Sequence, residues 1–359
     1  MADRTLDLAK ENKNDEFYTQ LSDIEKEMSH YKAYFENKTI LCNCDDPRVS
    51  NFFKYFALNF NNFKLKRLIT TCYKNQNADL FSQHDCEKAV WLDYKGNTKD
   101  PTSTDFSTIE VKELKGDGDF RSQECIELLK EADIVVTNPP FSLFREYIMQ
   151  LAKYNKKFII VGNKNAVTYK EVFNLIKENK VWIGYRNMNS DFWLEVPEGN
   201  KFEKIVDGKK LKHIMACWYT NLPTKKQFEE IISYKEYSPE EYPKYDNYNA
   251  IDIGKVTDIP KDYYGVMGVP ITFLDKYNPN QFEILELGIV GSCSFTCNKR
   301  MEILNKKTGK GTGKYTYNAK GTLYKKYNPK IDKKPPAFKD AKTGELYSSI
   351  YARIIIKKK

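Results

Sequence analysis

The chain has 359 residues, of which 58 are lysine or arginine and 49 are aspartate or glutamate, so its formal net charge is +9. No apolar run reaches the roughly 20 residues that span a bilayer, the N-terminal segment is too polar for a signal peptide, and the eight cysteines lack the dense spacing of a disulfide scaffold. These features argue against a membrane protein or a secreted disulfide-rich protein and predict a cytoplasmic location.

Short apolar runs alternate with amphipathic stretches between about Lys38 and Val161, a pattern typical of an α/β fold with a mostly parallel sheet. The strands that this pattern predicts are Thr39–Cys42, Lys66–Tyr73, Asp133–Thr137 and Phe158–Val161. The polar stretch from Asn75 to Thr108 contains Gly-Asn and Asp-Pro turn signals, so we expect an irregular insertion or a hairpin there.

Two of the predicted strands are followed by helical periodicity. Asp46 and Pro47 are suited to the N-cap and the first position of a helix that continues from Arg48 to Phe56. Helical spacing also returns at 141–151, directly after a strand end. Corners that join a strand to a helix through a short turn are the places where such folds bind ligands.

The composition changes after about Thr224, where tyrosine, proline and lysine become frequent and helical periods become rare. We therefore predict a first domain at 1–225 and a more irregular second region at 226–359. Residues 298–359 contain 18 lysines or arginines against 4 acidic residues, a balance of +14, which leaves −5 for residues 1–297. A basic surface of this kind suits phosphate contact, because each neutralised phosphate releases counterions. The alternative is a solvated, flexible lysine-rich surface.

The most basic segment, near 298–345, contains Gly-Thr-Gly-Lys and Lys-Lys-Pro-Pro, which are typical of loops, and has too few apolar residues for a core. We expect a mobile basic loop or hairpin there. The pair Cys293 and Cys297 has a spacing that metal sites use, but no second pair or closely spaced histidine completes four ligands. We therefore predict no metal site and interpret the cysteines as reduced packing residues.

The tetrapeptide Asn138-Pro139-Pro140-Phe141 holds the residues that we predict to be catalytic. An aromatic amine is a poor nucleophile, because its lone pair is delocalised into the ring, so an enzyme must localise that lone pair. The Asn138 carboxamide oxygen and the Pro139 carbonyl can accept the two protons of such an amine, and consecutive prolines make the loop rigid. Phe141 offers a face on which an extruded base can stack. The alternative is a strand-ending turn that merely uses Asn-Pro-Pro.

With the preceding threonine, this tetrapeptide resembles the catalytic motif of amino-methyltransferases, and its asparagine favours the N6-adenine class over the N4-cytosine class. The segments that further resemble the EcoRI-type adenine-specific DNA methyltransferases are Asp15–Gln20, Cys42–Ser50, Gly116–Arg121 and Gly265–Ile271. The resemblance implies a Rossmann-like S-adenosylmethionine methyltransferase sheet, followed by a C-terminal, more irregular DNA-recognition region. It also implies S-adenosylmethionine as the cofactor.

The residues that the resemblance implies for cofactor binding are Phe17, Tyr18, Thr19, Asp45, Asp119 and Phe120. The first three are expected to line the methionine end of the cofactor, and the last two to flank its adenine. The turn after the first strand lacks the glycines of the usual methyltransferase pattern; we expect one of its two aspartates to bind the cofactor and Asp46 to cap the helix. The second strand ends without an acid for the ribose, so the ribose contact stays unassigned.

The reaction implied is methyl transfer from S-adenosylmethionine to N6 of an adenine flipped out of double-stranded DNA, at a short palindrome such as GAATTC. A restriction endonuclease that acts on the same site, without a stable complex, is a further expected partner. C5-cytosine methylation is disfavoured because no proline in the chain is followed by a cysteine nucleophile. The alternatives left open are an RNA or protein-glutamine methyltransferase, and a DNA-binding protein whose methylase site has decayed.

Overall fold

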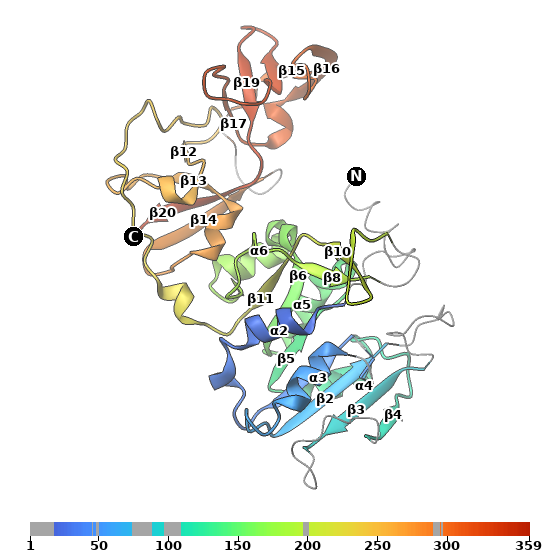
Figure 1. Cartoon of the computed structure of the whole chain (residues 1–359). Coiled ribbons are helices and arrows are strands. Elements are labelled where there is room, and N and C mark those ends of the chain that lie inside the picture. The colour runs from blue at the N-terminus through green and yellow to red at the C-terminus, as the bar shows by residue number, and fades with distance from the viewer. Residues whose placement is uncertain are drawn as a thin grey trace. The chain divides into compact units, whose positions relative to one another are not determined.

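The computed structural model describes residues 18–44, 46–47, 50–73, 88–96, 109–196, 201–289, 295 and 297–359. These residues form two compact units (Figure 1). The first unit contains the residues up to Thr224 without Phe173–Lys180, and the second contains Phe173–Lys180 and Lys225–Lys359. Each unit has sheets of its own.

An eight-stranded mixed sheet in the order β4-β3-β2-β1-β5-β6-β11-β7 is the centre of the first unit. Its strands are β1 (Thr39–Asn43), β2 (Arg67–Cys72), β3 (Val90–Tyr94), β4 (Val111–Glu113), β5 (Ile134–Thr137), β6 (Lys157–Asn163), β7 (Trp182–Ile183) and β11 (Ala216–Thr220). Strands β2, β1, β5 and β6 are parallel to one another, whereas β3 and β11 run antiparallel to the strands beside them. All four predicted strands are confirmed, and so is the α/β class. The sheet is mixed rather than mostly parallel as predicted, because strands β3, β4, β7 and β11 pair antiparallel with their neighbours.

Strand β3 lies inside the polar stretch that we expected to form an insertion or a hairpin. It pairs antiparallel with β2, so this part of the stretch is a strand of the main sheet. Residues 74–87 and 97–108 lie outside the described residues.

The helices of the described residues are α2 (Leu21–Met28), α3 (Asn51–Leu58), α4 (Gln123–Glu131), α5 (Phe144–Lys153) and α6 (Lys170–Lys177). Short 3-10 turns are η1 (Lys32–Tyr34), η2 (Phe141–Leu143), η3 (Lys164–Thr168), η4 (Lys225–Phe228), η5 (Val256–Asp258), η6 (Ile271–Asp275) and η7 (Asn318–Gly321). None of the helices in the described ranges has both the length and the apolar character that crossing a bilayer requires.

Helix α3 begins later than its sequence predicted. The N-cap is Ser50, whose hydroxyl accepts a hydrogen bond from the backbone N–H of Phe53 at 3.4 Å. Asp46 is therefore not the cap, and that prediction was wrong: its carbonyl accepts the backbone N–H of Ser50 at 2.8 Å, which places it in the turn before the helix. Serine and aspartate are about equally good caps, so propensity could not decide between them.

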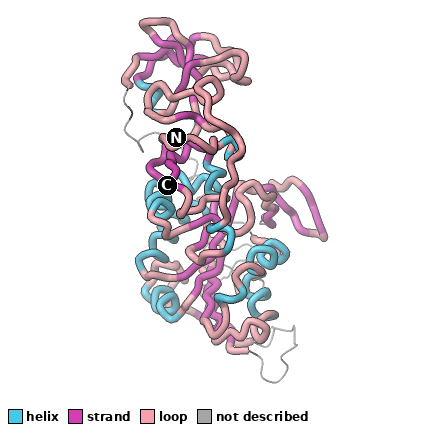
Figure 2. Tube along the Cα trace, turned by 90° about the vertical axis from the view of Figure 1, so that its left-hand side faces the viewer, coloured by secondary structure: helices cyan, strands magenta, loops and turns pink. Residues whose placement is uncertain are grey.

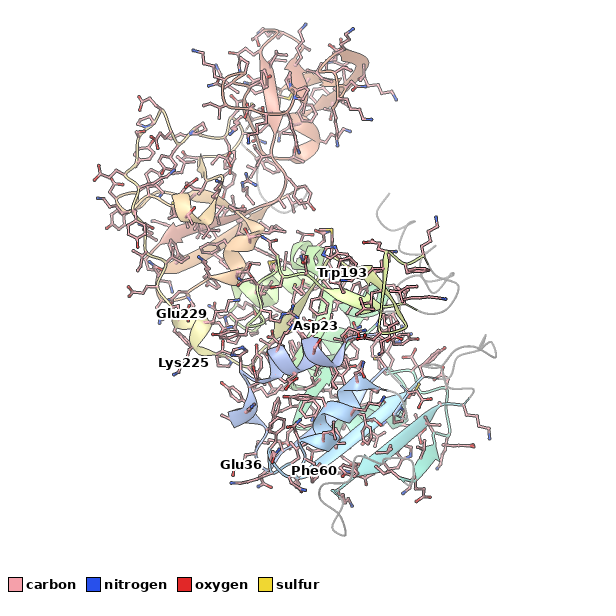
Figure 3. The ribbon with its side chains drawn as sticks, viewed as in Figure 1. Asp23, Glu36, Phe60, Trp193, Lys225 and Glu229 are labelled. Atoms are coloured by element: carbon pink, nitrogen blue, oxygen red, sulfur yellow. The ribbon has the colours of Figure 1, made fainter. Side chains whose placement is uncertain are left out.

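A buried carboxylate on helix α2 bonds this helix to the rest of the first unit. Glu27 is fully buried and accepts hydrogen bonds from the Tyr31 hydroxyl at 3.0 Å and from the backbone N–H groups of Tyr185 and Arg186 at 2.6 and 2.9 Å. Asp23, which lies one helical turn before Glu27 on α2 and is labelled in Figure 3, pairs with the Arg186 side chain at 2.7 Å. A buried charge is tolerated only when it is bonded in this way, so these contacts specify where α2 lies.

A separate three-stranded antiparallel sheet in the first unit has the order β8-β10-β9. Its strands are β8 (Trp193–Glu195), β9 (Lys204–Val206) and β10 (Lys209–His213). A backbone bridge joins Glu195 of β8 to Tyr18, with N···O distances of 2.9 and 3.0 Å. The start of the described chain is therefore held against this small sheet.

The second unit contains two further sheets, which Figure 2 shows as strands and loops with little helix. The first has the order β12-β13-β20-β14, with strands β12 (Ile251–Asp252), β13 (Met267–Pro270), β20 (Arg353–Lys358) and β14 (Phe282–Gly288). The second is antiparallel, with the order β16-β15-β18-β19-β17 and strands β15 (Arg300–Leu304), β16 (Gly311–Tyr317), β17 (Tyr324–Lys326), β18 (Phe338–Asp340) and β19 (Leu346–Ser349).

The second sheet corrects the expectation that the basic segment has no core. Met301, Ala319, Tyr324, Phe338 and Tyr347 pack together as a small apolar cluster. The strands are only three to seven residues long and are separated by lysine-rich turns, so no alternating pattern is long enough to stand out in the sequence. The segment is an ordered sheet with a basic surface.

Candidate active site

The carboxyl ends of β1, β2 and β5 meet at one edge of the eight-stranded sheet, because these strands are parallel neighbours. The strand order reverses at this point, since β2 lies on one side of β1 and β5 on the other. In open α/β sheets, ligands bind beyond the carboxyl ends of the strands at such a reversal. The residues after these three strands are therefore the candidates for a site.

The loop after β5 carries the predicted catalytic residues. Asn138 is buried, with 7% of its surface exposed. The preceding Thr137 donates its hydroxyl to the backbone carbonyl of Asn43, which joins the ends of β5 and β1. Pro139 is buried, and Pro140 is half-buried with φ −52° and ψ 131°. Since neither proline has an N–H, the loop offers carbonyl acceptors on a stiff backbone.

Phe141 opens the turn η2 and is 8% exposed. Its ring belongs to the large apolar cluster of the first unit, together with residues such as Ile134 and Val161. The ring face that we predicted to stack on a base is thus mostly covered by protein. A base that stacks on Phe141 has to displace part of that packing.

A series of contacts links the end of β1 to helix α5 and to the loop before α4. Tyr147 on α5 donates its hydroxyl to Asn43 Oδ1 at 2.5 Å, and its ring meets Phe120 edge to face with centroids 5.1 Å apart. Gln150, also on α5, donates to the Phe120 carbonyl at 2.9 Å. Complete burial raises the pKa of Tyr147 well above its ordinary value, so this hydroxyl remains a donor. Phe120 therefore lies at the strand-end edge to which Asn138 also belongs.

The loop at 116–121 packs against the end of β2. Gly118 has φ +78°, and a Cβ there would lie 2.6 Å from the Cys72 carbonyl, so glycine is required. Asp119 pairs with Arg121 through both carboxylate oxygens, at 2.9 and 2.6 Å, and Arg121 also reaches Glu146 of α5 at 2.7 Å. The backbone N–H and the guanidinium of Arg121 therefore orient the Asp119 carboxylate.

The turn after β1 has no glycine, and a cysteine occupies its left-handed position. Cys44 adopts φ +86°, in the left-handed region that glycine occupies most readily, and its N–H bonds the Thr71 carbonyl at 3.0 Å. A non-glycine residue in such a conformation costs about 1–3 kcal/mol and tends to occur at functional sites. Asp45, the predicted cofactor residue of this turn, lies outside the described residues.

The start of the described chain adds two more predicted residues to the same edge, while Phe17 lies outside the described residues. Tyr18 forms the bridge to Glu195, and the Thr19 carbonyl accepts the Asn51 side-chain amide at the first residue of α3. Thr19 is 2% exposed, and within the described residues its hydroxyl has no hydrogen-bond partner. A buried hydroxyl without a partner is costly. Because Thr19 also lies in the segment that the resemblance assigned to the cofactor, we propose that a ligand bonds this hydroxyl.

Sequence reasoning missed the role of Asn43 and Tyr147. Tyr147 occupies an apolar position of α5, where it looks like an ordinary core residue. The available signal was its hydroxyl, which needs a partner when it is buried. In the described part of the chain, no three His, Cys, Asp or Glu side chains are arranged to hold a metal. Cys293 lies outside the described residues, so the prediction that Cys293 and Cys297 bind no metal is not tested.

Comparison with known proteins identifies the family. Residues 5–359 match the family described as adenine-specific methyltransferase EcoRI. The type II methyltransferase M.EcoRI of Escherichia coli is 48% identical over 324 residues, covering 86% of this chain and 98% of that protein. M.MgeORF184P of Mycoplasma genitalium and M.MpnI of Mycoplasma pneumoniae, both type II methyltransferases, are 42% and 38% identical, and each alignment covers 77% of this chain and 84% of the relative. No solved structure matches the chain significantly.

The sheet edge and the family match together define a methyltransferase that uses S-adenosylmethionine as its methyl donor. The chain belongs to the EcoRI family of adenine-specific methyltransferases. It is thus a type II adenine-specific DNA methyltransferase, which sets aside the RNA and protein-glutamine alternatives.

The residues at the strand-end edge fit S-adenosylmethionine. We propose that the Thr19 hydroxyl bonds its amino-acid end and that Asp119 and Phe120 flank its adenine. We expect Thr19→Val to weaken binding of S-adenosylmethionine by about 3- to 10-fold, since one hydrogen bond is lost without a change of shape. Titration calorimetry with the full chain measures this effect.

Thr70→Val is the matched control for that variant. Thr70 on β2 is 1% exposed, and its hydroxyl likewise has no partner among the described residues. We expect this second variant to bind S-adenosylmethionine as the wild type does. If Thr19→Val, Thr70→Val and the wild type bind S-adenosylmethionine with equal affinity, Thr19 does not contact the cofactor.

Proposed function

We propose that the chain transfers a methyl group to N6 of an adenine that is flipped out of double-stranded DNA, on a Rossmann-like methyltransferase sheet. S-adenosylmethionine supplies the electrophilic methyl group when it is bound. The Asn138 carboxamide and the Pro139 carbonyl accept the two N6 hydrogens and so localise the lone pair of the nitrogen. Transfer is direct, and the proton lost from N6 passes to water.

The observation that carries this proposal is the shared edge. Asn138 follows β5, Thr137 bonds the carbonyl of Asn43, and Tyr147 connects Asn43 to Phe120. The Asn138 loop, which we predict to hold the target amine, and the Phe120 loop, which we predict to flank the adenine of the cofactor, are therefore connected by these contacts. Two loops that served unrelated purposes would not need to share these contacts.

We assign catalysis to residues 1–225 and DNA docking to residues 226–359. Lysines with exposed side chains are abundant on the five-stranded sheet and its turns, as at Lys306, Lys307, Lys310, Lys314, Lys330, Lys333, Lys334, Lys339 and Lys342. Such a surface suits the phosphate backbone and makes affinity fall with salt. We also propose that a restriction endonuclease recognises the same DNA site independently.

The experiment is transfer of labelled methyl from S-adenosylmethionine to unmethylated duplex DNA, followed by digestion to nucleosides. We expect the label in N6-methyladenine, and sequencing of the product then reads the site, including whether it is GAATTC. Label in another base would overturn the assigned position of transfer. DNA binding without transfer would instead support a decayed site.

A further inference from the structure

Strands β15 and β16 form a hairpin in the second unit, with β16 as the outer strand of the five-stranded sheet (Figure 1). Between residues 300 and 317 the chain has five lysines or arginines and one acidic residue, and the lysines of the turn at 305–310 are exposed. The single acid, Glu302, accepts the backbone N–H of Gly313 at 3.1 Å. The hairpin is therefore strongly basic, which favours contact with phosphates.

One face of this hairpin packs on the small apolar cluster, and the other faces solvent. Met301 is fully buried in that cluster, and successive residues of a strand point to opposite faces, so the exposed side chain of Arg300 points away from it. The register places Tyr317 opposite Arg300 and Tyr315 opposite Glu302, so both rings share the face of Arg300. Tyr315 is 50% exposed and Tyr317 is 63% exposed. The outer face thus presents an arginine and two aromatic rings.

The contacts of Arg300 differ from those of the other arginines that the structure describes. Each of the others pairs with a carboxylate; they are Arg67, Arg121, Arg145, Arg186 and Arg353. The Cζ of Arg300 instead lies 4.4 Å from the centre of the Tyr315 ring, and its guanidinium has no hydrogen bond or ion pair within the described residues. An aromatic ring orients a guanidinium in this way while the N–H donors stay available.

We propose that the β15–β16 hairpin enters the major groove of duplex DNA and that Arg300 reads a guanine of the recognised site. This inference rests on the proposed function, since it names a residue that selects the sequence to be methylated. The major groove is about 12 Å wide and admits a two-stranded ribbon. Guanine presents two acceptors there, O6 and N7, which a guanidinium can bond with two N–H groups at once.

The lysines of the turn have a different role from Arg300. Lys306, Lys307 and Lys310 are exposed point charges on flexible side chains, which suits phosphates at the rim of the groove. A phosphate contact depends mainly on charge and needs no fixed orientation of the donors. The Arg300 guanidinium is oriented by Tyr315, and such an orientation favours a base edge with two acceptors at fixed positions.

The test uses duplexes in which 7-deazaguanine, which lacks the N7 acceptor, replaces each guanine of the recognised site in turn. Sequencing of DNA methylated by the wild type gives that site. We expect one of these replacements to lower the wild-type kcat/KM by at least about fivefold, because a charge-assisted hydrogen bond is lost. The full-length variant Arg300→Ala should lose about 10- to 100-fold on normal DNA. The same replacement should then cost this variant no more than about twofold, because the contact is already absent.

Lys314→Ala is the matched control, since Lys314 is exposed on β16 and its replacement removes the same charge. It should weaken DNA binding and reduce the salt dependence of binding, while it keeps the wild-type sensitivity to 7-deazaguanine. Tyr315→Phe keeps the ring and should behave as the wild type, whereas Tyr315→Ala should be less sensitive to 7-deazaguanine. Because these side chains are exposed, we expect the melting temperatures of all four variants to match that of the wild type.

Three results would overturn this assignment. They are a wild type that is insensitive to every 7-deazaguanine replacement, an Arg300→Ala variant that keeps the wild-type sensitivity, and a recognised site without guanine in either strand. Weaker binding of single-stranded DNA by Arg300→Ala, together with unchanged sensitivity to 7-deazaguanine, would assign the outer face to single strands instead. Absence of N6-methyladenine with the wild-type enzyme would contradict the proposed function itself, which is a separate outcome.

Discussion

Replacement of Asn138 by alanine is expected to lower kcat by about 100- to 1,000-fold, the usual effect of removing one preorganised polar group from a reaction centre. The variant loses the carboxamide oxygen that we assign to an N6 hydrogen, whereas the backbone acceptor at Pro139 stays. Affinity for DNA should change little, because the charged surfaces are untouched. Single-turnover methylation and a DNA-binding titration at one fixed salt concentration measure the two quantities.

Asn138→Asp is the informative companion to that variant. Aspartate keeps an acceptor oxygen at the same position and the same size, so it should retain more activity than alanine. Asn138 is buried, so its replacement could also destabilise the fold. The melting temperatures of both variants must therefore match that of the wild type before their activities are compared. Near-wild-type turnover by a folded alanine variant would show that the N6 amine is held elsewhere.

Replacement of Asp252 by alanine is expected to have the largest effect on stability. The side chain of Asp252 on β12 is 5% exposed and pairs with Lys325 of β17 at 3.0 Å and Arg353 of β20 at 3.1 Å. It also accepts the Tyr245 hydroxyl at 2.8 Å. The carboxylate thus joins the two sheets of the second unit. Removing one partner of a buried ionic cluster costs about 3–5 kcal/mol, because the remaining charges lose their compensation.

Hydrogen exchange at the β20 amides of Ile354, Ile355 and Ile356 is the suitable measurement for this effect. All four tryptophans of the chain, Trp91, Trp182, Trp193 and Trp218, belong to the first unit, so their fluorescence does not report on the second. Asp252→Asn keeps the bond to Tyr245 without the charge and should lie between the wild type and the alanine variant. Unchanged protection of β20 in Asp252→Ala would show that the cluster does not stabilise the second unit.

The same cluster predicts a dependence on pH. Burial alone would raise the pKa of Asp252, but Arg353 and Lys325 lower it below its ordinary value. A carboxyl whose pKa is lower in the folded state stabilises the fold above its unfolded pKa, near 4, and loses that contribution as the pH falls through the folded value. The difference in β20 protection between the wild type and Asp252→Ala should therefore be full at neutral pH and shrink below about pH 4.

The central strands and the Asn138 loop could be predicted because their signals are local. Runs such as Ile134–Thr137 have four apolar or β-branched residues in succession, and two prolines after Asn138 end the strand by geometry alone. The start of α3 could not be predicted to the residue, because Asp46 and Ser50 are equally capable caps and only the path of the turn selects Ser50. The five-stranded sheet was missed because its five core residues are spread over 47 positions of lysine-rich chain, from Met301 to Tyr347.

The sequence by itself determined the parallel strands, the motif at Asn138 and membership of the EcoRI family, since each depends on residues close together in the chain. Only the tertiary structure decided that Tyr147 bonds Asn43, 104 positions away, and that Asp252 joins two sheets through Lys325 and Arg353. The physical reason is that these contacts depend on strand order and side-chain direction. Residues so far apart leave no periodic or compositional signal of the neighbours they acquire on folding.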